Sequence, residues 1–287
     1  MAFLRRCWLV GPPLSVPVLY ALALESLARA LELAPLEQIR LGIAGLPIVA
    51  IAFGWAMRWS CPESADPSPV LAKVRELFGD FSPFRLKLSV WENLHRVNAV
   101  SVGGIWTGAT IVVTRGLLNE LPAAGQRMLL LHEVAHQTRH HAWLRQLALL
   151  GLVIPFLQTW TLREPGSLSV WLASQVALLA WSYFALVTIN RCLEKDADLT
   201  ALRYAARLGW SSRLAAAALG RAIIQASPGP RDRANWSHPS VHERTRLLRV
   251  VGDRDSLEGV LNQPLTHVAW VLFVIGVIAI VSVGGAL

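Results

Sequence analysis

Five long apolar stretches, separated by polar ones, dominate the pattern of this chain. They are residues 7–24, 41–57, 146–162, 167–190 and 265–287. A helix that crosses a bilayer needs about 20 apolar residues, and at least about 17. Short linkers join the first stretch to the second and the third to the fourth. The pattern therefore predicts about five transmembrane helices, arranged as two hairpins and a final single span.

The first apolar stretch has a second interpretation. Arg5 and Arg6 precede it directly, as in the charged start of a secretory signal peptide. Its apolar run is longer than the core of a usual signal peptide, and a second apolar stretch follows closely. Prolines 12, 13 and 17 interrupt it, but membrane helices tolerate proline. We therefore favour a retained membrane helix and keep the cleaved signal peptide as the alternative.

The polar stretches show a mixed pattern of short strands and helices. We expect strands at 86–91, 98–102 and 110–114, with glycines between the last two that suggest a hairpin. We expect helices at 70–78, 115–121, 194–208, 212–225 and 240–251, and one that Pro122 opens and that runs toward the third apolar stretch. The polar stretches thus predict a folded domain rather than loops.

Composition supports a membrane protein. Hydrophobic residues make up 54% of the chain and charged residues only 16%, whereas soluble domains carry about 25% charge. Intrinsic disorder is excluded, because so apolar a chain must bury its surface. The three cysteines are widely spaced and form neither a disulfide framework nor a Cys-x-x-Cys metal site.

The net charge of +8 would suit nucleic-acid binding on a soluble protein. Here most arginines and all lysines fall in 58–145 and 191–258, while the hairpin linkers are poor in both. By the positive-inside rule those two stretches are cytoplasmic. The charge therefore predicts topology, and we expect no nucleic-acid partner.

These patterns divide the chain into five parts. We expect an N-terminal membrane hairpin (1–60), the first part of a cytoplasmic domain (61–145), a second hairpin (146–190), the second part of that domain (191–262) and a C-terminal helix (263–287). The second hairpin thus splits the cytoplasmic domain in two.

The helix after Pro122 carries the motif His-Glu-x-x-His. His132 and His136 are four positions apart, so both imidazoles lie on one helical face and can reach one ion. Glu133 stands beside that face and can act as a general base toward water. Imidazole ligands suit zinc. The motif predicts one catalytic zinc ion per chain.

A catalytic zinc site needs a third protein ligand. Glu194 and Asp198 follow the fourth apolar stretch and also share a helical face. Alone, the pair would be an acidic face at the start of a helix. With His-Glu-x-x-His at the mouth of the same hairpin, we favour Glu194 as the third ligand and Asp198 as the carboxylate that holds a ligand histidine.

A wider pattern, Arg191-x-x-Glu194-x-x-Ala197-Asp198 with His238-Pro239 and Arg244, resembles the HtpX-type and CAAX-prenyl-protease-type membrane zinc metallopeptidases, peptidase family M48. Asn98-Ala99 and the segment 111–118 also resemble the family. The resemblance implies a mainly α integral membrane protein with a split α+β zincin-like domain. It implies His132, His136 and Glu194 as zinc ligands, Glu133 as general base and Asp198 as support.

The resemblance also implies that His238 and Arg244 line the site. His238 would stabilise an oxyanion and Arg244 would orient a substrate carbonyl or carboxylate. The alternatives are a residue at the start of a helix for His238 and a surface or structural ion pair for Arg244. The last apolar stretch is not part of the HtpX layout. We interpret His140 and His141 as a polar collar beside the membrane.

The function expected from these features is a zinc endopeptidase of the bacterial cytoplasmic membrane. Its partners would be the bilayer and membrane-associated or misfolded protein substrates, which it would cut at the cytoplasmic face. The alternative is a BlaR/MecR-type signal transducer acting on a repressor. Such receptors carry an extracellular penicillin-binding sensor with a Ser-x-x-Lys motif, and no lysine here has a serine three positions earlier. A sensor supplied by a partner protein would keep this alternative open. A non-catalytic membrane scaffold is disfavoured by the complete motif.

Overall fold

The computed structural model describes residues 87–91, 96–104, 108–161, 168–227, 238–253 and 263–284, together with scattered residues between 23 and 56 and residues 230 and 234. The chain is mostly helical, with one small sheet. The first apolar stretch lies almost entirely outside the described residues, as does the helix expected at 70–78. The second apolar stretch, 41–57, is described only at scattered residues.

The sheet has three strands in the order β1-β3-β2. The hairpin expected from the glycines is confirmed, because β2 (Ala99–Gly104) pairs antiparallel with β3 (Gly108–Thr114). β1 (Lys87–Trp91) pairs with β3 in parallel. Strand β2 is therefore at one edge of the sheet.

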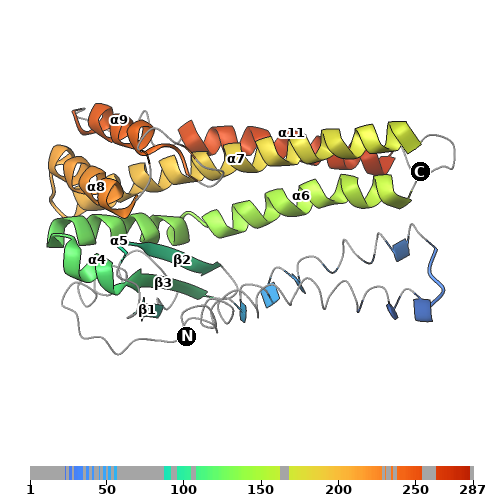
Figure 1. The fold of residues 1–287 in the computed structure, drawn as a ribbon, viewed down its shortest axis with the longest axis horizontal. Helices are drawn as coiled ribbons and strands as arrows, with labels where there is room; N and C mark the ends of the chain where they lie inside the picture. The colour runs from blue at the N-terminus through green and yellow to red at the C-terminus, as the bar shows by residue number, and fades with distance from the viewer. Residues whose placement is uncertain are drawn as a thin grey trace.

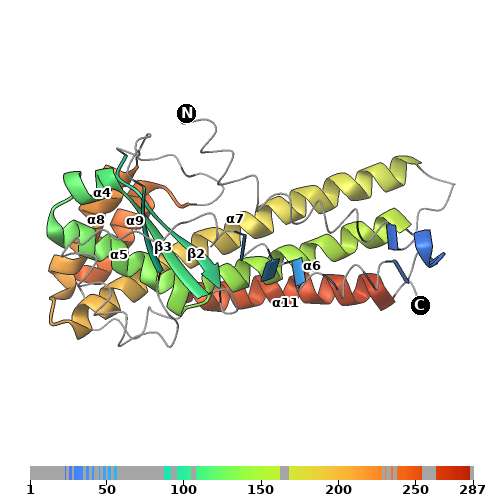
Figure 2. The ribbon, with the colours of Figure 1, turned by 90° about the horizontal axis from the view of Figure 1, so that it is seen from below.

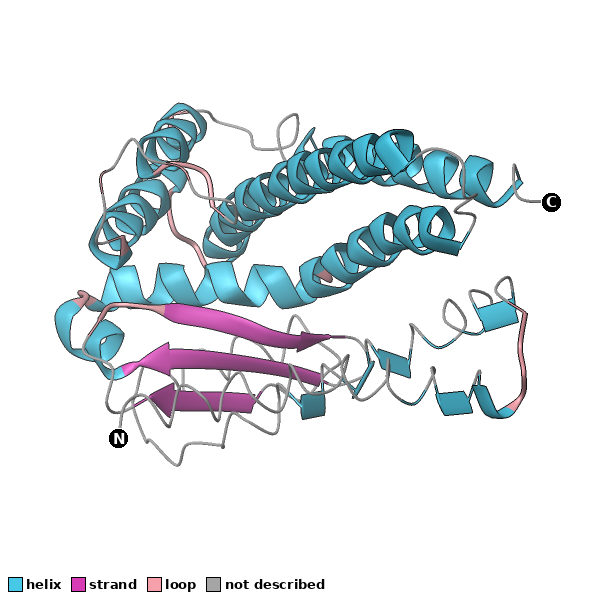
Figure 3. Ribbon diagram, turned by 45° about the vertical axis from the view of Figure 1, so that its right-hand side comes forward, coloured by secondary structure: helices cyan, strands magenta, loops and turns pink. Residues whose placement is uncertain are grey.

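Helix α5 (Ala123–Thr138) lies between two layers, with the sheet on one side and helices α8 and α9 on the other (Figures 1 and 3). The core beneath it includes Ile111 and Val113 from β3 and Met128, Leu130 and Leu131 from α5. The expected helices at 115–121, 212–225 and 240–251 are confirmed as α4 (Arg115–Glu120), α8 (Ser212–Ala226) and α9 (Val241–Gly252). Ser211 and Ser240 cap α8 and α9, each accepting a backbone N–H bond.

Three long helices extend from this domain: α6 (His141–Thr161), α7 (Leu168–Arg207) and α11 (Gln263–Gly284). Figures 1 and 2 show them side by side. A shared apolar core joins them, formed by Ala148, Leu152, Ala185, Ile189, Leu193, Val268 and Ile275. In the part of the chain that the structure describes, one helix, Trp171–Arg207, is long and apolar enough to span a membrane, and Gln263–Ile278 is a shorter apolar helix.

Two helix boundaries differ from the expectation. The helix after Pro122 does not run on into the third apolar stretch, because His140 adopts a left-handed φ of 56° and separates α5 from α6. The fourth apolar stretch and the helix expected at 194–208 are instead one helix of 40 residues. Gly209, with a φ of 81°, ends it, and its left-handed conformation is one that glycine adopts readily.

Candidate metal centre

The contact between α5 and α7 brings the two motifs together. His132 and His136 lie one turn apart on α5, and their Nε2 atoms are 3.2 Å from each other. Glu194 on α7 places Oε2 3.5 Å from Nε2 of His132 and Oε1 3.3 Å from Nε2 of His136. All three side chains are buried. Two segments that are distant in the sequence therefore bring their ligand-type atoms within 4.8 Å of one another, counting one atom from each residue.

The spacing and chemistry of these donors fit zinc. Ligands about 2.0–2.1 Å from a tetrahedral zinc ion are about 3.3 Å from one another. The two Nε2 atoms are 3.2 Å apart, and each lies 3.3 or 3.5 Å from a different oxygen of Glu194. With one ligand atom taken from each residue, the donors lie within 4.8 Å of one another. Two imidazoles and one carboxylate are also a ligand set that catalytic zinc sites use. His132, His136 and Glu194 could therefore hold the ion and leave its fourth position open.

Asp198 lies behind His132. Its Oδ1 atom is 2.9 Å from Nδ1 of His132, and Asp198 itself is fully buried. Arg244 on α9 donates to both Asp198 oxygens, from Nε at 2.8 Å and from a terminal nitrogen at 2.6 Å. The other terminal nitrogen of Arg244 is 3.6 Å from Oε2 of Glu194. A carboxylate on Nδ1 directs Nε2 of His132 toward the metal position.

His141 lies behind His136, with the two Nδ1 atoms 2.8 Å apart. Its other ring nitrogen, Nε2, is 2.9 Å from Oδ2 of Asp196. His140 is exposed, as expected of a polar collar, but His141 is completely buried, so the collar interpretation is wrong for His141. The left-handed turn at His140 folds His141 back toward α7 instead of leaving it at the surface.

The buried site shifts the acid–base properties of its groups. Burial raises the pKa of Glu133, although the positive charge of His132 opposes this shift. Burial also lowers the pKa of His136 to about 4, which favours the neutral form that binds metals. For His132 burial has the same effect, but Asp198 and Glu194 outweigh it and raise the pKa to about 9. Metal binding at His132 would therefore displace a proton.

Two further cationic or titratable side chains contact Glu194. His238 places Nδ1 3.1 Å from Oε2, and its side chain is half exposed at 51%. Arg145 donates to Oε1 at 3.2 Å. Sequence reasoning identified His238 but not Arg145, which stands among the charges that flank the third apolar stretch and carries no motif of its own. Both side chains are partly exposed, Arg145 at 39%, whereas the Glu194 carboxylate that they contact is buried.

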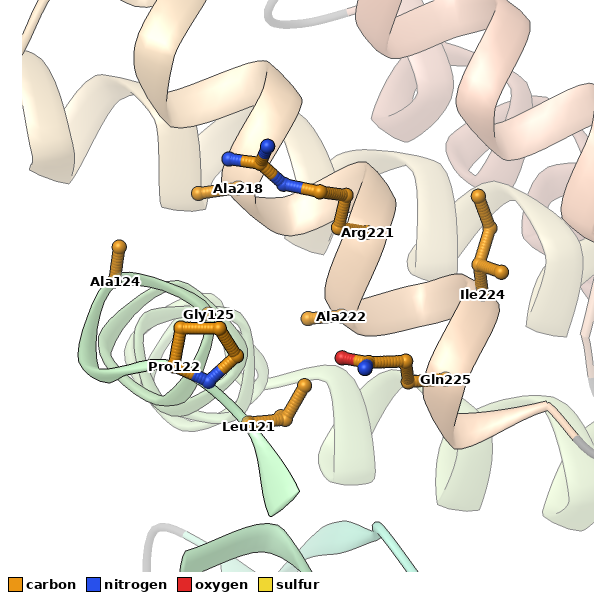
Figure 4. Close-up of a pocket in the computed structure, with 9 residues that line it drawn as sticks. All are labelled: Leu121, Pro122, Ala124, Gly125, Ala218, Arg221, Ala222, Ile224 and Gln225. Atoms are coloured by element: carbon orange, nitrogen blue, oxygen red, sulfur yellow. The ribbon is translucent and has the colours of Figure 1, made fainter.

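A separate pocket lies between the start of α5 and α8, about two turns from His132 (Figure 4). Its lining residues are Leu121, Pro122, Ala124, Gly125, Ala218, Arg221, Ala222, Ile224 and Gln225. Arg221 and Gln225 are the polar side chains of this set, and none of its residues is a nucleophile, a carboxylate or a histidine. Among the described residues, His132, His136 and Glu194 form a group that could hold a metal ion, and this pocket is separate from it.

The family model of Peptidase family M48 matches residues 72–251. The curated proteins contain no match to the sequence. A similar solved structure is the crystal structure of S. mikatae Ste24p, with 18% sequence identity and a TM-score of 0.55. The match covers 85% of this chain and 64% of that chain, so this chain spans less than two thirds of the Ste24p length. At this identity the likeness shows a shared fold.

Proposed function

The chain belongs to peptidase family M48, and on that premise we propose that it is a membrane-embedded zinc endopeptidase. One observation carries the proposal. His132, His136 and Glu194 form a buried cluster in which one ligand atom from each lies within 4.8 Å of the others, and Glu133 follows His132 directly in the sequence. This combination supplies three zinc ligands and a general base, which are the parts that hydrolysis of a peptide bond requires.

Bound zinc supplies a Lewis acid that polarises the scissile carbonyl and makes water more acidic. Glu133 accepts a proton from the attacking water and passes it to the leaving amine. The raised pKa of Glu133 makes its carboxylate a stronger base than an exposed glutamate. Asp198 keeps Nε2 of His132 directed at the metal position while charge develops.

His238 is proposed as the group that stabilises the developing oxyanion. It contacts Glu194 and is half exposed, so a substrate can reach its ring. For Arg244 the internal ion pair is the better-supported role. Two of its nitrogens bind Asp198, and its side chain is only 10% exposed.

Strand β2 is the proposed binding edge for an extended peptide. Asn98 and Thr114 form a hydrogen-bonded pair, so by alternation the backbone groups of Ala99, Ser101 and Gly103 point away from β3. Gln137, next to His136, donates to Ser101 Oγ and, at 3.0 Å, to the carbonyl of Val102. Because this contact fixes β2 to the metal-binding helix, a peptide paired with β2 would pass beside the zinc position.

The proposed location is the bacterial cytoplasmic membrane, crossed about five times, with the active site on the cytoplasmic side. Large apolar side chains are exposed along the long helices, including Val176 at 66%, Phe184 at 64% and Trp270 at 64%. Exposed apolar surface of this kind favours contact with lipid. Proteins in or near that membrane, including misfolded ones, are then the proposed substrates.

The test is a Glu133→Gln variant of the purified full chain, assayed on fluorescently labelled casein. We expect zinc content and folding to be retained and the cleavage rate to fall by about 10²–10⁴-fold, since only the proton acceptor is lost. Glu120→Gln, at an exposed position on α4, is the matched control and should cleave normally. Normal cleavage by Glu133→Gln would refute the mechanism.

A further inference from the structure

A series of hydrogen-bonded polar side chains lies behind His136. Its Nδ1 atom is 2.8 Å from Nδ1 of His141, and Nε2 of His141 is 2.9 Å from Oδ2 of Asp196. Arg139 is the last member of the series and donates to both Asp196 oxygens, at 3.1 and 3.3 Å. His141 and Asp196 have no exposed surface at all. Polar groups buried this deeply are retained only where their hydrogen bonds are satisfied.

When His136 binds a metal, each residue of this series can donate one hydrogen bond to the next, from His136 to His141 and from His141 to Asp196. Nε2 of His136 must then present its lone pair to the ion, so Nδ1 carries the proton and donates to Nδ1 of His141. His141 must accept at Nδ1 and therefore carries its own proton on Nε2, which it donates to Asp196. Both rings are thereby fixed in a single tautomer, and the guanidinium of Arg139 neutralises the carboxylate at the end.

The arrangement depends on the break between α5 and α6. Arg139 and His141 flank His140, whose left-handed φ of 56° turns the chain. Without that turn, a residue five positions after His136 would lie about 140° away from it around the helix. The turn instead returns the His141 ring to His136. The break in the helix thus has a role in the site.

Asp196 is two residues before Asp198 on α7, which places the two side chains about 200° apart around that helix. Asp198 contacts its ligand histidine directly at 2.9 Å, whereas Asp196 reaches the other ligand histidine through an interposed imidazole. Each carboxylate also receives two hydrogen bonds from one arginine. Each ligand histidine is therefore backed by a carboxylate and an arginine. His132 contacts its carboxylate directly, and the imidazole of His141 lies between His136 and Asp196.

We infer that His141 is a positioning residue for the zinc ligand His136, and that Asp196 and Arg139 hold it in place. The inference rests on the proposed function, because it assumes a metal at His132, His136 and Glu194. It gives a role to two buried groups, His141 and Asp196, that the hydrolytic mechanism does not use. Loss of such an outer partner typically weakens metal affinity by about 10–100-fold.

The experiment measures metal binding directly in the full chain purified in detergent. Zinc affinity is determined by competition with a chromophoric chelator, and the visible absorption of the cobalt-substituted protein reports ligand geometry at saturation. The variants are His141→Ala, His141→Asn and Asp196→Asn. The matched control is His140→Asn, which removes the exposed neighbouring ring and keeps a residue that tolerates positive φ.

We expect His141→Ala to bind zinc about 10–100-fold more weakly and to show an altered cobalt spectrum even at saturation. His141→Asn keeps an acceptor near the Nδ1 position, so it should recover part of the affinity. Asp196→Asn should resemble His141→Asn, and His140→Asn should match the wild type. Recovery by asparagine and a changed spectrum at saturation would not arise from a purely structural role.

Wild-type zinc affinity and an unchanged cobalt spectrum in His141→Ala would overturn the inference. If that variant does not fold, as judged by circular dichroism and gel filtration, His141→Asn and Asp196→Asn decide the matter, and wild-type binding by both overturns it. Failure of the proposed function gives a different result. In that case the wild-type chain would bind no zinc, or His132→Ala would bind it as tightly as the wild type.

Discussion

Replacement of Asp198 by alanine should destabilise the protein strongly, even with the metal removed. Asp198 is fully buried and accepts both hydrogen bonds from Arg244, at 2.8 and 2.6 Å. Without the carboxylate, the described residues leave the buried guanidinium one acidic neighbour, Glu194, whose Oε2 lies 3.6 Å from a terminal nitrogen of Arg244. Removing one partner of a buried ion pair lowers the free energy of unfolding by about 3–5 kcal/mol, because the other charge stays buried without compensation. We expect a loss of that size in the free energy of unfolding.

A double mutant separates the charge effect from simple loss of packing. Arg244→Met removes the stranded cation and replaces it with an apolar side chain of similar length. Replacement of both members of a buried pair is often nearly neutral. The double variant Asp198→Ala/Arg244→Met should therefore be less destabilised than the sum of the two single variants, by about 0.5–3 kcal/mol, as is usual for directly contacting residues.

The assay is denaturant-induced unfolding of the detergent-solubilised chain in excess chelator. The chelator is needed because zinc binding stabilises the folded state by mass action and would add to the measured difference. Asp198→Asn, which keeps the volume and one acceptor oxygen, is the conservative comparison and should lose less stability. The reasoning is refuted if Asp198→Ala unfolds within about 1 kcal/mol of the wild type, or if the single-variant effects simply add.

Three further predictions concern the metal, the packing of the long helices and the topology. His136→Ala or Glu194→Ala should abolish stoichiometric zinc measured by metal analysis, because only two donors remain; full zinc in Glu194→Ala would mean that another group is the third ligand. Gly151→Ala should cost about 1–3 kcal/mol in thermal unfolding, because the added methyl group would overlap Ile275 on α11. In an Ile275→Ala background, which removes the clashing methyl group, Gly151→Ala should cost less than it does in the wild type. Equal stability of Gly151→Ala and the wild type would contradict the packing. A reporter that is active only outside the cytoplasm should be active after the last residue and silent near Gly229, and the reverse pattern would place the site outside.

The parts of the structure that depend on local spacing could be predicted from the sequence. His132 and His136 are four positions apart in a helix, so their common face follows from the helical period alone. The β2–β3 hairpin likewise follows from glycines between two β-type segments. Predicting Glu194 as a ligand needed one additional assumption, that the third and fourth apolar stretches form a helical hairpin whose two ends lie on the same side of the membrane.

The support behind His136 could not be predicted in this way. A continuous helix would carry His141 away from His136, and a single backbone angle at His140 reverses that outcome. Nothing in the composition around Arg139 and His141 distinguishes a left-handed turn from a polar segment beside a membrane. Parallel pairing of β1 with β3 is also a long-range contact, with no turn between the strands to indicate it.

Because α7 is one continuous helix, a tilt of its apolar half moves Glu194 as well. Its 40 residues form a rod about 60 Å long, and Glu194 lies about 22 Å along the axis from the centre of the apolar segment near residue 179. A tilt of one degree about that centre would displace Glu194 by about 0.4 Å, whereas functional sites require their groups within about 0.5 Å. The packing of α6 and α11 against α7 must therefore hold its orientation to within about one degree. Any change in the surroundings that tilts the apolar half of α7 would act directly on the geometry of the metal centre.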